Sequence, residues 1–169
     1  MNLDARIEAL DGPLPAIRWT WDDETDILSG AMAGLKKSGG LTGTIELTDD
    51  EGSVAVVDVA GGRIQGIDIV VWPEVTEVPG LTPPEASRDG VVTLPPRQSQ
   101  PGIASVEVDT TLSVAANPRH DTLHLRIGTK RQVEAVRVAD HLLIEVDGKG
   151  RLAGFWLLSV PFGPDGDPA

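Results

Sequence analysis

The feature that most constrains the fold is a similarity between the two halves of the chain. Residues 64–73 (IQGIDIVVWP) align with residues 152–161 (LAGFWLLSVP) at a constant offset of 88 positions. Further upstream, residues 21–28 resemble residues 116–123 at an offset of 95, so a length change lies between the two matches. A repeat of this length indicates a folding unit that occurs twice, and we interpret the chain as an internal duplication. The identical pairs at offset 88 are Gly62 and Gly150, Arg63 and Arg151, Gly66 and Gly154, and Pro73 and Pro161.

The residue content of both halves favours β-strands. Valine and isoleucine together number 28, and 19 glycines and 13 prolines separate the short runs that they form. Two segments have the spacing of short helices, one at Leu3, Ile7 and Leu10 and the other at residues 31–37. Each unit alone would bury too little surface to be stable. We therefore predict an all-β fold of two related antiparallel units, packed as a pseudo-dimeric sandwich or barrel, with one or two short helices.

A proline-rich stretch divides the chain. Seven of the 13 prolines lie between Pro73 and Pro101, and prolines keep a segment extended and out of a central strand. We predict a first β unit at residues 1–74, a linker at 75–101 with a short edge strand at 91–94, and a second β unit at 102–162. The final residues 163–169 (GPDGDPA) have the composition of a disordered tail.

Charge and the absence of cysteine exclude several classes of function. Acidic residues outnumber basic ones by 26 to 14, and the formal net charge of −12 argues against binding of nucleic acid or of an anionic membrane surface. A chain without cysteine has no disulfide and no thiolate nucleophile. No apolar run reaches the ~18 residues of a membrane span, and the acidic N-terminus lacks the apolar segment of a secretory signal. We expect a soluble cytoplasmic protein.

Motifs for metal, cofactor and nucleophilic chemistry are missing. His120 and His124 are four residues apart, but this spacing spans a turn and a strand, and no third ligand is evident. The sequence has no phosphate-binding loop, no dinucleotide fingerprint and no nucleophile elbow. We therefore expect neither a metal nor a cofactor.

The second half carries a recurring order of turn and strand motifs. These are NPRHD at 117–121, LHLR at 123–126, LLIEVD at 142–147, GR at 150–151 and LAGFWLL at 152–158. In this order, residues 113–160 resemble domain-of-unknown-function family 2283, a family of small bacterial β domains, and a degenerate second copy covers about residues 17–73. The resemblance implies a small antiparallel β fold. It implies no known chemistry, so no catalytic residue is carried over.

The chain departs from the pattern of this family at three positions. Asn117 replaces the usual aspartate, His124 replaces the usual tyrosine, and Trp156 stands at a position that is usually acidic. Asp68 fills the position of Trp156 in the first copy. A tryptophan exposed there would leave a large apolar surface in water, so we predict that Trp156 is covered, together with Leu158 on the same face.

Strand alternation places a group of polar and aromatic residues on one face of the second unit. If the strands form one antiparallel meander, this face carries His124, Arg126, Arg137, Glu145 and Trp156. A histidine and a carboxylate can transfer protons near neutral pH, so His124 and Glu145 are the catalytic candidates. Arginines can hold an anion and tryptophan can stack on a ring. The alternative is a solvent face with cross-strand salt bridges.

The other three tryptophans lie in the first half. Trp19 and Trp21 share a strand face, and Trp72 lies at the end of a strand. They either fill the core and the contact between the units, or line a pocket there that binds a ligand.

Two functions of different classes fit these observations. The leading hypothesis is a non-enzymatic binding or accessory protein, whose acidic surface pairs with a basic protein partner. The alternative is a small enzyme, a cyclase or isomerase, that acts on an apolar metabolite in a tryptophan-lined cavity between the two units. Either protein would be a monomer or a homodimer.

Overall fold

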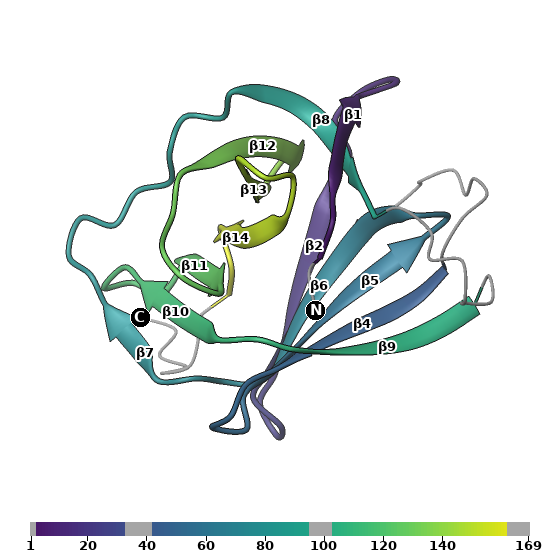
Figure 1. Cartoon of the computed structure of the whole chain (residues 1–169). Helices are drawn as coiled ribbons and strands as arrows, with labels where there is room; N and C mark the ends of the chain where they lie inside the picture. The colour runs from purple at the N-terminus through teal and green to yellow at the C-terminus, as the bar shows by residue number, and fades with distance from the viewer. Residues whose placement is uncertain (1–2, 33–41, 95–102, 162–169) are drawn as a thin grey trace.

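The structure is a computed structural model that describes residues 3–32, 42–94 and 103–161. The described residues form strands and no helix, so the all-β prediction is confirmed. Figure 1 shows the strands in one curled mixed sheet that forms a half-barrel. The strands are β1 (Arg6–Ala9), β2 (Ile17–Asp22), β3 (Ile27–Met32), β4 (Thr42–Thr48), β5 (Val54–Ala60), β6 (Arg63–Val71), β7 (Val75–Glu77), β8 (Arg88–Thr93), β9 (Ile103–Asp109), β10 (Leu112–Ala116), β11 (Thr122–Ile127), β12 (Val133–Ala139), β13 (Leu142–Asp147) and β14 (Leu152–Leu158).

The prediction of short helices is wrong for the residues that the structure describes. Ile7 lies in β1, where it pairs with Val92 of β8 in an antiparallel ladder. An isolated segment of this length is too short to form a stable helix in water, so pairing with a neighbouring strand decides its conformation. Of the second predicted helix, Ala31 and Met32 belong to β3, and residues 33–37 lie outside the described residues. The predicted disordered tail also lies outside them.

The two halves of the chain have the same strand order. Strands β2 to β6 pair in the order β2-β3-β6-β5-β4, and strands β10 to β14 pair in the order β10-β11-β14-β13-β12, all antiparallel. The register agrees as well. Ser29 pairs with Asp68, and His124 pairs with Trp156, which are the same positions at offsets of 95 and 88.

The proline-rich segment contributes two strands to the sheet. β7 pairs in parallel with β10, and β8 lies between β12 and β6 in the strand order. The prediction of an edge strand at 91–94 is therefore wrong, because β8 has partners on both sides. The prolines of the segment lie before or after β8 in the sequence, so every residue of this strand keeps its amide donor. As a division into domains, the boundaries at 74, 101 and 162 stay a prediction.

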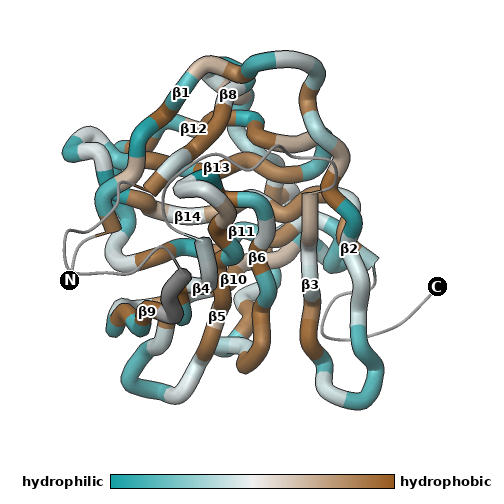
Figure 2. Tube along the Cα trace, turned by 90° about the vertical axis from the view of Figure 1, so that its right-hand side faces the viewer, coloured by the Kyte–Doolittle hydropathy of each residue, from teal (hydrophilic) through white to brown (hydrophobic). Residues whose placement is uncertain are grey.

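The main core lies between the two β units. One face of β11, β13 and β14, with Leu125, Ile144 and Phe155, packs in the same cluster as Leu28 and Ile67 of the first unit. Figure 2 shows hydrophobic stretches along β3 and β5 and a hydrophilic turn between β2 and β3. This packing leaves the opposite face of β11, β13 and β14 turned away from the first unit.

A polypeptide segment runs along that opposite face. Residues 78–87 connect β7 to β8, and hydrogen bonds fix their two ends at the two edges of the second unit, Val78 N to Ala116 O and Ser87 N to Ala135 O. Figure 1 shows this connection on the side of the sheet away from β2 and β6. Ala135, Leu143 and Trp156 of the second unit are buried but do not belong to the main core cluster.

The N-terminal segment joins the first unit to a turn of the second. Ala5 N donates to Gly150 O, and Leu152 N donates to Leu3 O. Leu3 is buried in the main core by this contact. The segment therefore forms one wall of the space at the end of β11, β13 and β14.

Candidate functional site

Three of the residues selected from the sequence meet in one cluster. His124 and Trp156 face each other across β11 and β14, and their rings are stacked with centroids 4.3 Å apart and planes 14° apart. Nε2 of His124 lies 2.7 Å from Oε1 of Glu145, and Nε1 of Trp156 donates to Oε2 of Glu145 at 3.2 Å. Each oxygen of the carboxylate therefore has its own ring donor.

Glu145 is a buried charge with partners. The residue is only 6% exposed, and burial alone would raise its pKa. The hydrogen bond and charge of His124, with smaller contributions from Trp156 and Arg126, instead lower the pKa of Glu145 below its usual value. An ionised carboxylate only accepts hydrogen bonds, so Nε2 of His124 carries a proton. The arrangement holds an imidazole in a fixed orientation, as acid–base sites require.

Trp156 is buried, at 6% exposure. Its face is the one turned away from the first unit, along which residues 78–87 run (Figure 1). Leu158 is half-buried at the end of the same strand. The indole of Trp156 is therefore covered, as predicted from the sequence.

Gly154 makes room for the cluster. It stands opposite Glu145 on β14, and a Cβ added there would lie 2.7 Å from Oε1 of Glu145 and 3.5 Å from Nε2 of His124. Side chains at this position would displace the hydrogen-bonded pair. Gly154, which aligns with Gly66 at the offset of 88, thus has a packing role beside Glu145.

The two arginines selected from the sequence have different positions. Arg126 is close enough to Glu145 for its charge to lower the pKa of that carboxyl. Arg137 lies on the same face, opposite Leu143 on β13, with β13 and β14 between it and His124. Within the described part of the chain, Arg137 makes no hydrogen bond and no ion pair. The structure therefore brings Arg126 to the cluster and leaves Arg137 apart.

The remaining tryptophans lie far from this cluster in the first unit. Trp19 and Trp21 pack against the main core from β2. The rings of Trp21 and Trp72 are 5.8 Å apart and tilted by 47°, and Nε1 of Trp72 donates to Asp26 O at 2.7 Å. Trp19 covers Gly30, since a Cβ added there would lie 2.2 Å from its ring. Their contacts are those of core and turn packing.

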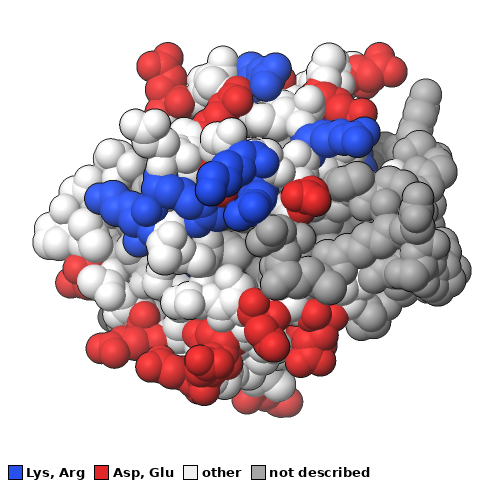
Figure 3. All heavy atoms as spheres, viewed as in Figure 1, with Lys and Arg blue, Asp and Glu red and all other residues white. Residues whose placement is uncertain are grey.

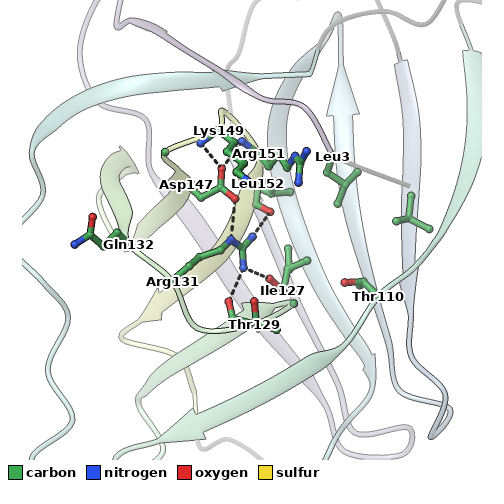
Figure 4. A pocket seen from close by; sticks show the side chains of 13 residues that line it. Leu3, Thr110, Ile127, Thr129, Arg131, Gln132, Asp147, Lys149, Arg151 and Leu152 are labelled. Atoms are coloured by element: carbon green, nitrogen blue, oxygen red, sulfur yellow. Dashed lines mark hydrogen bonds and ion pairs between the residues drawn. The ribbon is translucent and has the colours of Figure 1, made fainter.

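A pocket of about 600 Å³ opens where the second unit meets the N-terminal segment. Figure 4 shows its side chains, which come from that segment, from the end of β9 and the connection that follows it, and from the ends of β11 and β13 with the connections after them. Four apolar side chains form much of the wall: Leu3, Val108, Ile127 and Leu152. Polar groups of the lining include Thr110, Thr129, Gln132, Lys149 and Arg151.

Arg131 and Asp147 hold the two connections in place. Nε of Arg131 donates to Oδ2 of Asp147 at 2.8 Å, and Nη1 donates to the carbonyls of Ile127 and Thr129. Burial would raise the pKa of Asp147, but the hydrogen bonds from Arg131 and from two backbone amides of its turn lower it. Arg131 is therefore a structural part of the wall.

Lys149 and Arg151 are the cations of this pocket whose side chains have no partner among the residues that the structure describes. Asp147 binds only their backbone amides, at 2.9 and 3.0 Å. Figure 4 shows the side chain of Arg151 extended toward Leu3. In Figure 3 the basic side chains gather over the β12–β14 region, with acidic groups above and below them.

A sequence signal for these residues was present. The chain has only 14 basic residues, and five of them lie within 22 positions: Lys130, Arg131, Arg137, Lys149 and Arg151. β11 and β13 run in the same direction, because both are antiparallel to β14, so the connections that follow them lie at the same end of the sheet. Charge clustering together with this strand direction would have predicted a basic end.

Comparison with known proteins adds no functional information. No protein-family model matches the chain, and no curated protein matches it. In the described ranges, no group of three or more His, Asp or Glu residues is arranged to hold a metal ion. The same ranges contain no helix long and apolar enough to cross a membrane.

Proposed function

We propose that this chain is a non-enzymatic binding protein, and that its ligand is a small amphipathic organic anion held in the 600 Å³ pocket. The observation that carries the proposal is the combination of apolar walls with Lys149 and Arg151, two cations that lack side-chain partners within the described ranges. In a chain of net charge −12, such a basic pocket is a local reversal of charge. Ligand pockets of ~300–1,000 Å³ with mostly apolar walls and few polar groups are typical of small-molecule sites.

The chemistry of the lining defines the ligand class. Leu3, Val108 and Ile127 offer contact to an apolar body, and each buried methylene contributes ~0.8 kcal/mol. Arg151 can bind a carboxylate, sulfonate or phosphate through two parallel hydrogen bonds, and Lys149 adds a point charge. A neutral molecule of the same shape would contact the apolar side chains but would form no ion pair with Lys149 or Arg151.

Calorimetric titration with octanoate and with octanol tests this proposal. We expect octanoate to bind more tightly than octanol, and the double substitution Lys149→Gln with Arg151→Gln to weaken octanoate binding by at least about tenfold. The matched control replaces Arg18 and Arg119 by glutamine, which removes the same charge from exposed positions outside the pocket. Equal binding by both double variants would contradict the proposal.

A second candidate function is docking of a basic protein. Asp22 ends β2, and Asp23 and Glu24 follow it in the turn before β3. The turn between β4 and β5 contains Asp49, Asp50 and Glu51. The two turns lie at the same end of the first unit, and Figure 3 shows acidic groups gathered at the lower end of the molecule. Capture of a basic protein from the native host, lost when these six residues become amides, would support this function.

The pocket-enzyme alternative depends on a tryptophan-lined cavity between the units. No tryptophan lines the 600 Å³ pocket, so this pocket gives the alternative no support. The hydrogen-bonded pair of His124 and Glu145 is the feature that an acid–base reaction would use.

We also infer that the two β units derive from one ancestral unit that was duplicated and fused. The shared strand order and the agreeing registers of Ser29 with Asp68 and His124 with Trp156 support this inference. The pseudo-dimeric packing and the membership of residues 113–160 in family 2283 stay proposals. A solved structure of a member of that family with the order β10-β11-β14-β13-β12 would support both.

A further inference from the structure

A second and smaller pocket lies on the other face of β11, β13 and β14. It encloses about 150 Å³ and is lined by His124, Arg126, Thr129, Lys130, Arg131 and Glu145, among others. Thr129 and Arg131 also line the 600 Å³ pocket, so the connection after β11 separates the two. At ~30 Å³ for each water molecule, the volume corresponds to about five waters. This is room for a small ion and too little for most organic ligands.

The charges around this pocket do not balance. The guanidinium of Arg131 is committed to Asp147 and to backbone carbonyls. The carboxylate of Glu145 accepts hydrogen bonds from His124 and from the indole N–H of Trp156 in β14. Arg126 and Lys130 make no hydrogen bond or ion pair with the part of the chain that the structure describes. Two positive charges therefore face the pocket without a counter-charge beyond that of Glu145.

The side chains of His124 and Glu145 at the base of the pocket are held in place by contacts with each other and with Trp156. Glu145 is only 6% exposed, and its two oxygens have separate donors at 2.7 and 3.2 Å. The indole of Trp156 stacks on the imidazole of His124 and so fixes the orientation of that ring. Because Glu145 is already satisfied, it does not have to swing toward Arg126 to obtain a partner. Arg126 stays available to a ligand.

We propose that this pocket binds a small oxyanion of the size and charge of phosphate, held by Arg126 and Lys130 above the His124–Glu145 pair. Arginine binds such an ion through two hydrogen bonds, and lysine contributes a point charge. The site is independent of the proposed function, because it uses different cations on the opposite face of the sheet.

Titration with inorganic phosphate tests the site. We expect saturable binding, measured by calorimetry, at an ionic strength kept constant with chloride so that general screening does not change. We also expect the imidazole proton resonances of His124 to shift with phosphate and not with chloride. Lys130→Gln, at an exposed position, and Arg126→Gln should each weaken phosphate binding by about tenfold.

Two control proteins separate this site from other basic positions. Arg137→Gln removes a cation from the same face outside the pocket, and the Lys149→Gln, Arg151→Gln double variant removes the cations of the other pocket. Both should bind phosphate as the parent does. Absence of saturable binding to the parent, or equal weakening in the controls, would overturn the proposal. Loss of octanoate binding with retention of phosphate binding in the double variant would support both sites separately.

Discussion

Equivalent positions of the two β units hold opposite electrostatic arrangements. In the first unit these positions carry Ser29, Asp58 and Asp68, where Asp58 stands opposite Gly66 and Asp68 stands opposite Ser29. Burial raises the pKa of both carboxyls, and the charge of Asp68 raises that of Asp58 further. A hydrogen bond from Ser29 offsets part of the effect at Asp68. The face therefore holds two like charges that disfavour each other.

In the second unit the same positions carry His124, Glu145 and Trp156. The single carboxylate receives a hydrogen bond from each ring, and its pKa is lowered although it is more deeply buried. The comparison shows that the backbone does not decide whether a charge on this face is favourable. The neighbouring side chains decide it: the second unit gives one carboxylate two ring donors, whereas the first unit gives Ser29 as the donor to Asp68 and adds the like charge of Asp68 beside Asp58.

The largest effect should come from giving the second unit the residue of the first. Trp156→Asp removes a buried aromatic side chain, at a cost of ~3–5 kcal/mol, and places a carboxylate beside Glu145. We expect the free energy of unfolding, measured by urea titration, to fall by at least this amount. Val71→Asp is the matched control, because Val71 is 47% exposed at the end of β6. A Trp156→Asp variant as stable as the control would show that the indole does not pack.

The next largest effect should come from the charge of Glu145. Glu145→Gln leaves the shape but removes the ionised acceptor of His124, which should cost ~1–3 kcal/mol at pH 7. The folded-state pKa of Glu145 is lowered, so its contribution is complete above the unfolded value of ~4.3 and is lost as the pH falls through the folded-state value. The difference between parent and variant in urea unfolding should therefore shrink below that pH. A difference that is constant with pH would contradict this account.

The carboxylates of the first unit should show the opposite sign. Asp58 and Asp68 have raised folded-state pKa values, so their ionised forms destabilise the folded protein at neutral pH. Asp58→Asn or Asp68→Asn should raise the free energy of unfolding by less than about 1 kcal/mol, since both groups are half-exposed and screened. As the pH falls through the folded-state pKa toward the unfolded value of ~3.9, the parent should regain this difference. Destabilisation by both substitutions at pH 7 would overturn the comparison.

Local sequence patterns predicted the strands and the shared face of the second unit. Alternation placed His124, Glu145 and Trp156 on one face because side chains of a strand alternate with period two. The offsets of 88 and 95 aligned positions that have the same pairing in the two units.

Features that depend on distant pairing were not predicted. The N-terminal spacing of Leu3 and Ile7 fits a helix, but β8 and the turn at Gly150 supply backbone partners that no local pattern contains. The central position of β8 and the pocket at Leu3 follow from the same long-range pairing. Such contacts join residues from 30 positions apart, as between Arg63 and Thr93, to 149 positions apart, as between Leu3 and Leu152, and local sequence patterns do not specify them.

The smallest effect should come from Arg137, and it decides how far the cluster extends. Strand alternation predicted that Arg137 shares this face with the other residues. Arg137 stands opposite Leu143, however, and β13 and β14 lie between it and His124. It makes no ion pair within the described ranges. Arg137→Gln should change the free energy of unfolding by no more than ~0.5 kcal/mol and should leave the imidazole resonances of His124 unchanged in a proton spectrum. Glu145→Gln should move those resonances, because it removes the charged acceptor of Nε2. If Arg137→Gln moves them as far, the field of Arg137 reaches the pair, and the contrast between the two units then includes the whole face of β11–β14 rather than three residues.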